Sequence, residues 1–157
     1  MRKTRKYITN LALKRNPSAY FIFGEYCFHK ITPLVSEGIY FYELAANQNI
    51  IQAQLTLSKI YSKGKYVPRD MNKSLHYLKL AADLNSLTAQ IILGQYFYDG
   101  RHIDKNINKS IHYYTLAAKQ NDADALVKLG KIYFDNENIP RDVNKAIHFF
   151  SIGSRFK

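Results

Sequence analysis

Residues 89–121 read AQIILGQYFYDGRHIDKNINKSIHYYTLAAKQN, and their spacing decides the fold. Ala89, Leu93, Gly94 and Phe97 recur at intervals of four, one and three residues, which is typical of one face of an α-helix. Gly100 ends that helix, because glycine enters the left-handed backbone conformation without steric cost. A second periodic set follows and ends before an asparagine cap: Ser110, Tyr113, Tyr114, Ala117, Ala118 and then Asn121. The stretch therefore predicts a helical hairpin.

The same pattern returns along the chain with a period of 36 residues. Its paired alanines fall at Ala45-Ala46, Ala81-Ala82 and Ala117-Ala118, with Gly153-Ser154 in the corresponding place of a fourth copy. A fixed period of this length is typical of a stacked solenoid, in which each unit buries its apolar face against its neighbours. We therefore expect an all-α fold, a right-handed α/α superhelix that offers a surface for binding and no deep pocket.

The expected solenoid is a single domain over residues 1–157. It consists of a basic leading helix at 1–18 and four repeats at 19–52, 53–88, 89–124 and 125–157. Turn and cap residues support these divisions. In the second repeat Gly64 ends the first helix, Pro68 interrupts the connector, and Asp70 is placed to cap the second helix.

Small residues recur on the first helices, at Gly24, Ser58, Gly94 and Gly130. We expect them to let the backbone of one helix approach the paired alanines of another, while neighbouring aromatic side chains fill the wider space. Replacing Ala82 or Ala118 by leucine is then expected to overpack the junction, at about 1 to 3 kcal/mol.

The recurring positions form one motif, Ala-x3-Leu-Gly-x2-Tyr-x2-Gly followed by Asp-x2-Lys-Ala-x2-aromatic-aromatic-x2-Ala-Ala. It resembles the Sel-one-like repeat (SLR), a relative of the tetratricopeptide repeat, over essentially the whole chain. The residues that form this signature are Ala53, Ala81, Ala82, Ala89, Gly94, Gly100, Ala117, Ala118, Ala125 and Gly130. The resemblance implies an all-helical superhelix that acts as an adaptor or scaffold for protein complexes, without catalysis.

Individual turns depart from the family pattern. Asparagine stands at positions 49, 85 and 121, where the family usually has glycine, and Lys30 and Asn136 replace the glycine that ends the first helix. Leu34 and Asn106 replace the capping aspartate.

The exposed side of the first helices is the candidate partner surface, since it lines the concave wall in tetratricopeptide-like solenoids. Projection at 100° per residue places three rows there: Phe21, Leu55, Ile91 and Val127; Glu25, Lys59, Gln95 and Lys131; Phe28, Ser62, Tyr98 and Phe134. The predicted contact residues are Phe28, Lys59, Gln95, Tyr98, Lys131 and Phe134. The apolar first row has a second interpretation, as core between repeats, and Tyr98 and Phe134 are favoured as exposed.

No pattern in the sequence predicts catalysis, a cofactor or a metal site. His76, His112 and His148 recur every 36 residues, but helices pack 8 to 10 Å apart whereas zinc ligands lie near 2 Å from one point, so a solvated face is favoured. Asp70 and Asp142 are explained as caps. Cys27, the only cysteine, occupies a core slot and excludes an intramolecular disulfide.

The net charge of +11 supports an alternative function, a basic solenoid that binds nucleic acid or an anionic membrane surface. Its candidate residues are the cluster Arg2 to Lys6 and the repeated Lys73, Lys109 and Lys145. An electrostatic binder of this kind loses affinity steeply between about 50 and 200 mM salt, which separates it from a protein scaffold.

We further expect a cytoplasmic, intracellular protein, because the sequence shows no secretory signal, no membrane-length apolar run and one cysteine. No polar capping helix follows the last repeat. We therefore expect either a segment of a longer repeat array or a chain that associates end to end.

Overall fold

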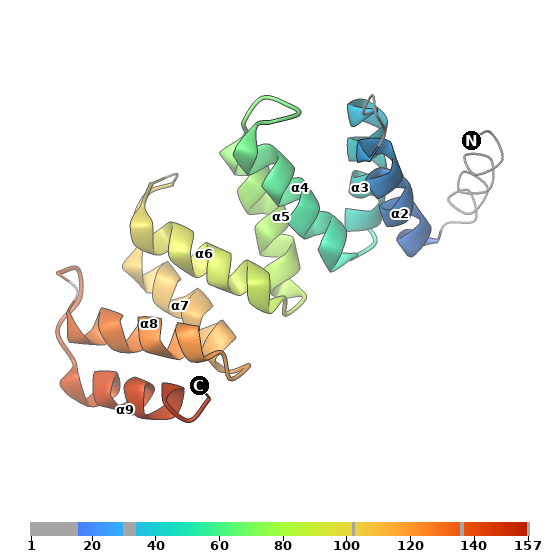
Figure 1. Cartoon of the computed structure of the whole chain (residues 1–157). Helices are drawn as coiled ribbons and strands as arrows, with labels where there is room; N and C mark the ends of the chain where they lie inside the picture. Colours follow the sequence, from blue (N-terminus) through green and yellow to red (C-terminus); the bar gives the residue numbers. More distant parts are fainter. Residues whose placement is uncertain (1–15, 30–33, 102, 136, 157) are drawn as a thin grey trace. The chain divides into compact units, whose positions relative to one another are not determined.

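The computed structural model describes residues 16–29, 34–101, 103–135 and 137–156. Every regular element among these residues is an α-helix, and consecutive helices pair as antiparallel hairpins (Figure 1). The prediction of an all-α fold built from helical hairpins is confirmed. Of the leading helix predicted over residues 1–18, residues 1–15 lie outside the described residues. Pro17 and Ser18 belong to α2, the first helix of the first hairpin.

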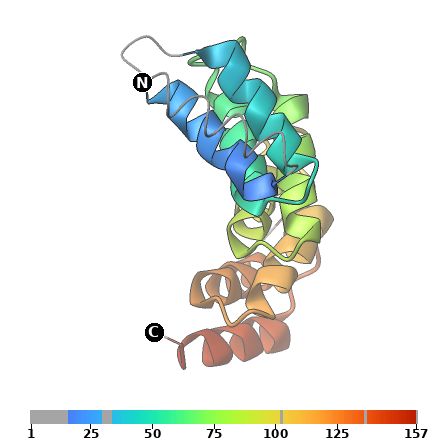
Figure 2. The ribbon, with the colours of Figure 1, turned by 90° about the vertical axis from the view of Figure 1, so that its right-hand side faces the viewer.

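The first unit, residues 1–84, contains two described hairpins. In one, α2 (Pro17–Phe28) packs along α3 (Val35–Ala46), which Figure 2 shows in blue and cyan. In the other, α4 (Ile51–Lys63) packs along α5 (Met71–Asp83), and α3 also contacts α4. The shared core consists of Ile39, Tyr42, Ala45, Ala46, Ala53, Leu57, Ile60 and Tyr61.

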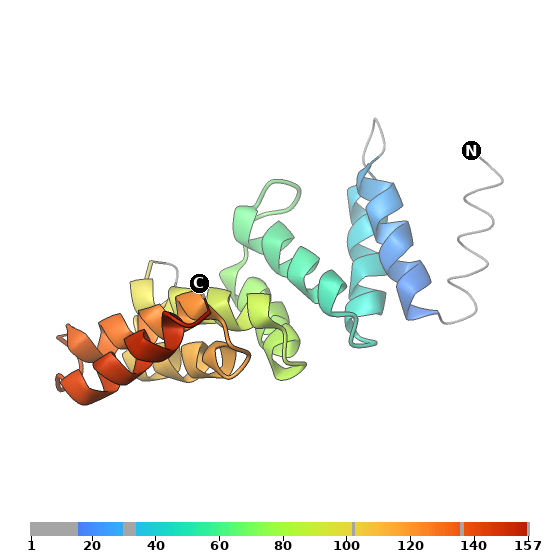
Figure 3. The same ribbon diagram turned by 60° about the horizontal axis from the view of Figure 1, so that its bottom comes forward.

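The second unit, residues 85–157, repeats this arrangement. Its hairpins are α6 (Leu87–Asp99) with α7 (Ile107–Ala118) and α8 (Ala123–Phe134) with α9 (Val143–Gly153). The latter pair lies side by side in orange and red in Figure 3. A core cluster joins the two hairpins through α7 and α8 and consists of Ile107, Tyr114, Ala117, Ala125, Leu129 and Ile132.

The backbone confirms the predicted glycine and asparagine turns and the aspartate caps at the described positions, whereas Lys30 and Asn136 lie outside the described residues. Gly64 and Gly100 have φ of 64° and 67°, and the asparagines at 49, 85 and 121 each have φ of 63°. Asp70 and Asp142 accept hydrogen bonds from the backbone N–H three residues on, each at 2.9 Å. Asn106 makes the same cap to Lys109, also at 2.9 Å, so this departure from aspartate preserves the cap. Leu34 makes no side-chain cap.

The small residues of the first helices face side chains of the second helix, which corrects the expectation that they receive the paired alanines. A Cβ added to Gly24 would lie 2.6 Å from the ring of Tyr42, and one added to Gly94 would lie 2.9 Å from the ring of Tyr114. The second repeat has Leu78 in place of this ring, and there Ser58 replaces the glycine. Glycine and ring therefore occur together in the other three hairpins, where the third pair is Gly130 and Phe150.

Two buried glutamines were not singled out by the sequence pattern. Gln54 is fully buried; its Nε2 donates to the Ala46 carbonyl at 3.1 Å, while its Oε1 accepts no hydrogen bond from any described residue. Gln90, one repeat later, belongs to a polar network. Its Nε2 donates to Asn85 Oδ1 at 3.1 Å, and its Oε1 accepts from Gln120 Nε2 at 2.8 Å.

We expect leucine at these two positions to have opposite effects on stability. Gln54→Leu removes an unsatisfied acceptor, and Ala46 O keeps its bond from Asn49 N, so the free energy of unfolding should stay constant or rise by about 1 kcal/mol. Gln90→Leu removes one hydrogen bond from Asn85 Oδ1 and one from Gln120 Nε2, although these two atoms keep their bond to each other at 3.2 Å, and it should lower the free energy of unfolding by about 1 to 3 kcal/mol. Urea unfolding followed by circular dichroism measures both. Leucine already occupies the corresponding position of the fourth repeat, at Leu126. Equal losses of stability in the two variants would contradict this account.

Candidate functional site

Two members of the predicted polar row on the first helices are hydrogen-bonded to a tyrosine of the second helix, and the other two are not. Tyr42 Oη donates to Glu25 Oε1 at 2.5 Å, and Tyr114 Oη donates to Gln95 Oε1 at 2.9 Å. In the other two hairpins the corresponding side chains are Leu78 and Phe150, which have no hydroxyl group. The row has a carboxylate or amide only where a tyrosine requires an acceptor.

The other two members of that row are lysines. Lys59 on α4 and Lys131 on α8 are exposed, one in each unit. Among the residues that the structure describes, neither ammonium group lies within ion-pair distance of a carboxylate. Because Glu25 and Gln95 are hydrogen-bonded within their own hairpins, Lys59 and Lys131 are the members of the row with exposed side chains that make no such bond among the described residues.

The aromatic row is only partly exposed. In the second unit Phe134 is 44% exposed, with the Arg141 guanidinium 4.4 Å from its ring centroid. Tyr98 is half-buried and packs against the core of that unit. In the first unit Phe28 is half-buried, stacked on Tyr42 at a centroid distance of 5.6 Å.

The apolar row is neither fully exposed, as a partner surface would be, nor fully buried, as a core between repeats would be. All four of its members are half-buried: Phe21, Leu55, Ile91 and Val127. Phe21 packs against the core of the first unit and Ile91 against that of the second. The row therefore contributes to packing inside each unit while leaving part of its surface accessible.

In the first unit the structure brings two predicted contact residues together. Phe28 and Lys59 line one hollow of about 290 Å³ beside the carboxyl end of α4. Tyr66, in the connector after α4, lines it as well and is 40% exposed. The sequence pattern missed Tyr66, because projection on a helix says nothing about a side chain in the connector that follows.

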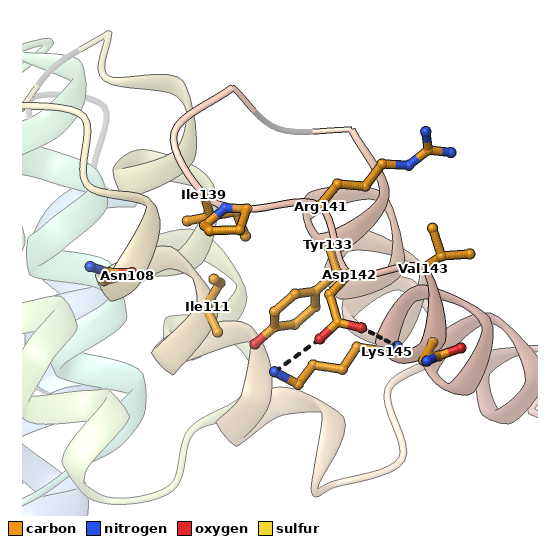
Figure 4. Close-up of a pocket in the computed structure, with 10 residues that line it drawn as sticks. Asn108, Ile111, Tyr133, Ile139, Arg141, Asp142, Val143 and Lys145 are labelled. Carbon is orange, nitrogen blue, oxygen red and sulfur yellow. Dashed lines mark hydrogen bonds and ion pairs between the residues drawn. The ribbon is translucent and has the colours of Figure 1, made fainter.

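A second kind of hollow lies beside each Pro-Arg-Asp connector. In the second unit its volume is about 490 Å³, and Ile111, Tyr133, Ile139, Asp142 and Lys145 are among the side chains around it (Figure 4). The Lys145 ammonium group pairs with Asp142 at 3.2 Å, and backbone and side-chain hydrogen bonds from Lys145 lower the pKa of Asp142. These charges satisfy one another as part of the helix cap.

The repeated lysines have a structural role inside their hairpins. Lys73, Lys109 and Lys145 place Nζ over the rings of Tyr61, Phe97 and Tyr133, at 4.9, 5.2 and 5.0 Å from the centroids. Such cation–π contacts explain the 36-residue recurrence of lysine. The first repeat has Cys27 in place of the ring and Glu37 in place of the lysine. Cys27 is buried, as predicted.

The repeated histidines are exposed, as their position opposite the core stripe predicts. His76, His112 and His148 each meet the next residue's ring edge-on, at centroid distances of 5.2, 5.2 and 5.6 Å. Within the described ranges, no three His, Cys, Asp or Glu side chains come together in a way that could hold a metal ion.

The pKa values of three tyrosines in these hairpins are raised, which makes the stability of the fold depend on pH. Burial, with a second contribution from the Glu43 carboxylate, raises the pKa of Tyr77 to about 12, and burial also raises the pKa values of Tyr42 and Tyr114. An unfolded tyrosine ionises near pH 10. The stability that depends on these protonated side chains is therefore complete below pH 10 and is lost as the pH rises above it.

We expect the free energy of unfolding to fall between pH 10 and pH 12, and to fall less steeply in the Tyr114→Phe variant, which has no hydroxyl to ionise. Urea unfolding at pH 9, 10 and 11 measures both slopes. Tyr40→Phe makes the same substitution at an exposed position and serves as the comparison. Identical slopes in Tyr114→Phe and the parent would contradict the prediction.

The four helical hairpins correspond to a repeat that is known in other proteins. A family model of the Sel1 repeat matches residues 31–50, 51–86, 87–122 and 123–155. The chain belongs to the Sel1 repeat family. The resemblance to the Sel-one-like repeat noted in the sequence is thus confirmed.

Solved structures of Sel1 repeat proteins share the fold. The crystal structure of a Sel1 repeat protein from Oxalobacter formigenes is similar at 26% identity and a TM-score of 0.71, over 90% of this chain and 59% of that one. A protective antigen of uropathogenic Escherichia coli strains, which displays an SLR fold, is similar at 22% identity and a TM-score of 0.77, over 96% of this chain and 32% of that one. Helicobacter pylori cysteine-rich protein B is similar at 21% identity and a TM-score of 0.58, over 79% of this chain and 90% of that one.

The chain spans about three fifths of the Oxalobacter protein and about one third of the Escherichia coli antigen. No curated protein sequence matches it. Sel1 repeat proteins are generally non-catalytic helical scaffolds, and protein–protein interaction is their common role. In the described part of the chain, no helix has the length and apolar character that crossing a membrane requires.

Proposed function

We propose that this Sel1 chain is a non-catalytic scaffold that binds a partner polypeptide on the exposed side of its first helices. The observation that carries the proposal is the division of the polar row. Lys59 and Lys131 are exposed on α4 and α8, whereas the equivalent Glu25 and Gln95 accept hydrogen bonds from buried tyrosines. Phe28 beside Lys59 and Phe134 on the helix of Lys131 add apolar surface, which suits recognition of an extended or helical peptide.

The charge distribution favours a protein partner over a polyanion. Eight of the 23 lysines and arginines lie outside the described residues and all 12 acidic residues lie inside them, so the described part has a formal charge of about +3. The three repeated lysines are also held over rings. The alternative, a basic solenoid for nucleic acid or an anionic membrane, therefore depends mainly on the charges of residues 2–15.

Site-specific photo-crosslinking tests the proposal. A benzophenone amino acid placed at Lys59 or at Lys131 should give a discrete crosslinked polypeptide in a lysate of the source organism. Matched controls are Lys79 on α5 and His112 on α7, which are also exposed but lie on second helices. Crosslinks that form only from the second helices, or from none of the four positions, would contradict the proposal. The pair Tyr98→Ala and Phe134→Ala should weaken capture from the second unit.

A further inference from the structure

The hollow in the first unit, between the end of α4 and the hairpin of α2 and α3, has an unusual charge. The eight described residues that line it include three lysines and no acid: Phe28, Tyr42, Thr56, Lys59, Ile60, Lys63, Lys65 and Tyr66. In the described residues, no carboxylate lies within ion-pair distance of these three ammonium groups. Lys65 Nζ lies 5.1 Å from the ring centroid of Tyr66.

The wall of the hollow is aromatic and well supported. Phe28 stacks on buried Tyr42 and meets Tyr66 edge-on at a centroid distance of 4.9 Å. Ile60 adds an aliphatic surface and is only 8% exposed. A volume of about 290 Å³ lies at the small end of the range for ligand sites, which suits one large side chain better than a cofactor.

We propose that this hollow binds an acidic segment of a partner polypeptide, which inserts one large apolar or aromatic side chain and places its carboxylates beside Lys59, Lys63 and Lys65. The inference rests on the proposed scaffold function and adds the chemistry of the partner. We infer an acidic segment from charge complementarity. Three lysines that have no carboxylate partner among the described residues surround the apolar side chains of the hollow. An anchoring side chain in such a pocket contributes most of the binding energy at many interfaces.

The equivalent positions in the second unit reverse the charge. Seventy-two residues after Lys63, Lys65 and Tyr66 stand Asp135, Glu137 and Asn138. Lys131 there is accompanied by two acids, whereas Lys59 is accompanied by two further cations. An acidic peptide should therefore occupy one site per chain, in the first unit.

The same hollow is poorly suited to single-stranded nucleic acid. Nucleic-acid grooves combine a track of phosphate contacts with exposed ring faces on which bases stack. Here Phe28 is stacked on Tyr42, Lys65 covers a face of Tyr66, and the cations surround a single side-chain-sized hollow.

The test uses the full chain and a fluorescein-labelled acidic peptide with one central phenylalanine between glutamates, followed by fluorescence anisotropy. We expect saturable binding at one peptide per chain. The triple variant Lys59→Glu, Lys63→Glu, Lys65→Glu should weaken it at least about tenfold. A matched triple variant with the same net charge, Lys79→Glu, Lys105→Glu, Lys119→Glu, changes exposed lysines elsewhere and should stay within about twofold of the parent.

Two further comparisons examine the hollow itself. Exchanging the central phenylalanine of the peptide for alanine should weaken binding about tenfold, and Tyr66→Ala should weaken binding of the phenylalanine peptide only. Thermal melts show that each variant is folded.

Several results would overturn the inference. Among them are equal losses in the two triple variants, indifference to the phenylalanine, or a labelled oligonucleotide that requires the three lysines while the peptide does not bind. Crosslinking from Lys59 without binding of the acidic peptide would reject this inference and leave the scaffold function standing, whereas absence of every first-helix crosslink rejects the scaffold function.

Discussion

Gly94→Ala should lower the free energy of unfolding by about 2 kcal/mol, although alanine ordinarily stabilises a helix relative to glycine by about 1 kcal/mol. The new methyl group would lie 2.9 Å from two ring carbons of Tyr114. That ring is 1% exposed, and its hydroxyl is held by Gln95 at 2.9 Å, so it cannot move aside. The steric cost therefore exceeds the gain in helix propensity.

A double-mutant cycle with Tyr114→Leu tests this reason directly. The second repeat is its natural precedent, because Ser58 and Leu78 stand there in place of the glycine and the ring. Tyr114→Leu alone should destabilise, but Gly94→Ala added to it should cost little or nothing, giving a coupling energy above about 1 kcal/mol. Chemical denaturation of the four proteins gives that energy, and additive effects would rule out the paired packing.

Gly130→Ala is the matched control for the same contact. Its methyl group would lie 2.7 Å from the ring of Phe150, but that ring is 36% exposed and has no hydroxyl to hold it. Because Phe150 can rotate toward solvent, we expect a loss well below that of Gly94→Ala.

Ala117→Leu should lower the free energy of unfolding by about 3 kcal/mol, at the upper end of the range for overpacking. Ala117 is 0% exposed and belongs to the core cluster that joins α7 to α8. Three additional carbon atoms have no room there without displacing a neighbouring helix.

Ala118→Leu is the matched comparison, at the next residue of the same helix. The sequence pattern predicts a loss of about 1 to 3 kcal/mol for Ala118→Leu, but Ala118 is half-buried and packs at the edge of that cluster, which corrects the expected overpacking at this alanine. We therefore expect a loss below about 1 kcal/mol. Thermal melts of the two variants give the ordering, and an equal shift of the midpoint in both would contradict the difference in burial.

The candidate site was predictable only in part. Helical projection placed Phe28 and Lys59 on one side of the first helices, and the structure brings them to a common hollow. Projection could not supply Tyr66, since that residue lies beyond Gly64, where the chain leaves the helix. It also counted Gln95 as a contact residue, because a side chain that bonds to Tyr114 across the hairpin has the same sequence spacing as one that faces a partner.

The sequence by itself determined the helical hairpins, their period and their ends. These depend on local effects that a few neighbouring residues exert: glycine or asparagine in the left-handed conformation, an aspartate or asparagine cap, and small and large side chains at helical spacing. Tertiary structure alone decided which side chains meet across a hairpin. The packing of two helices decides whether Gly94 faces a ring or the paired alanines, and whether the side chain of Lys59 or of Gln95 is exposed. That packing depends on contacts between residues about 20 positions apart, which the local pattern does not show.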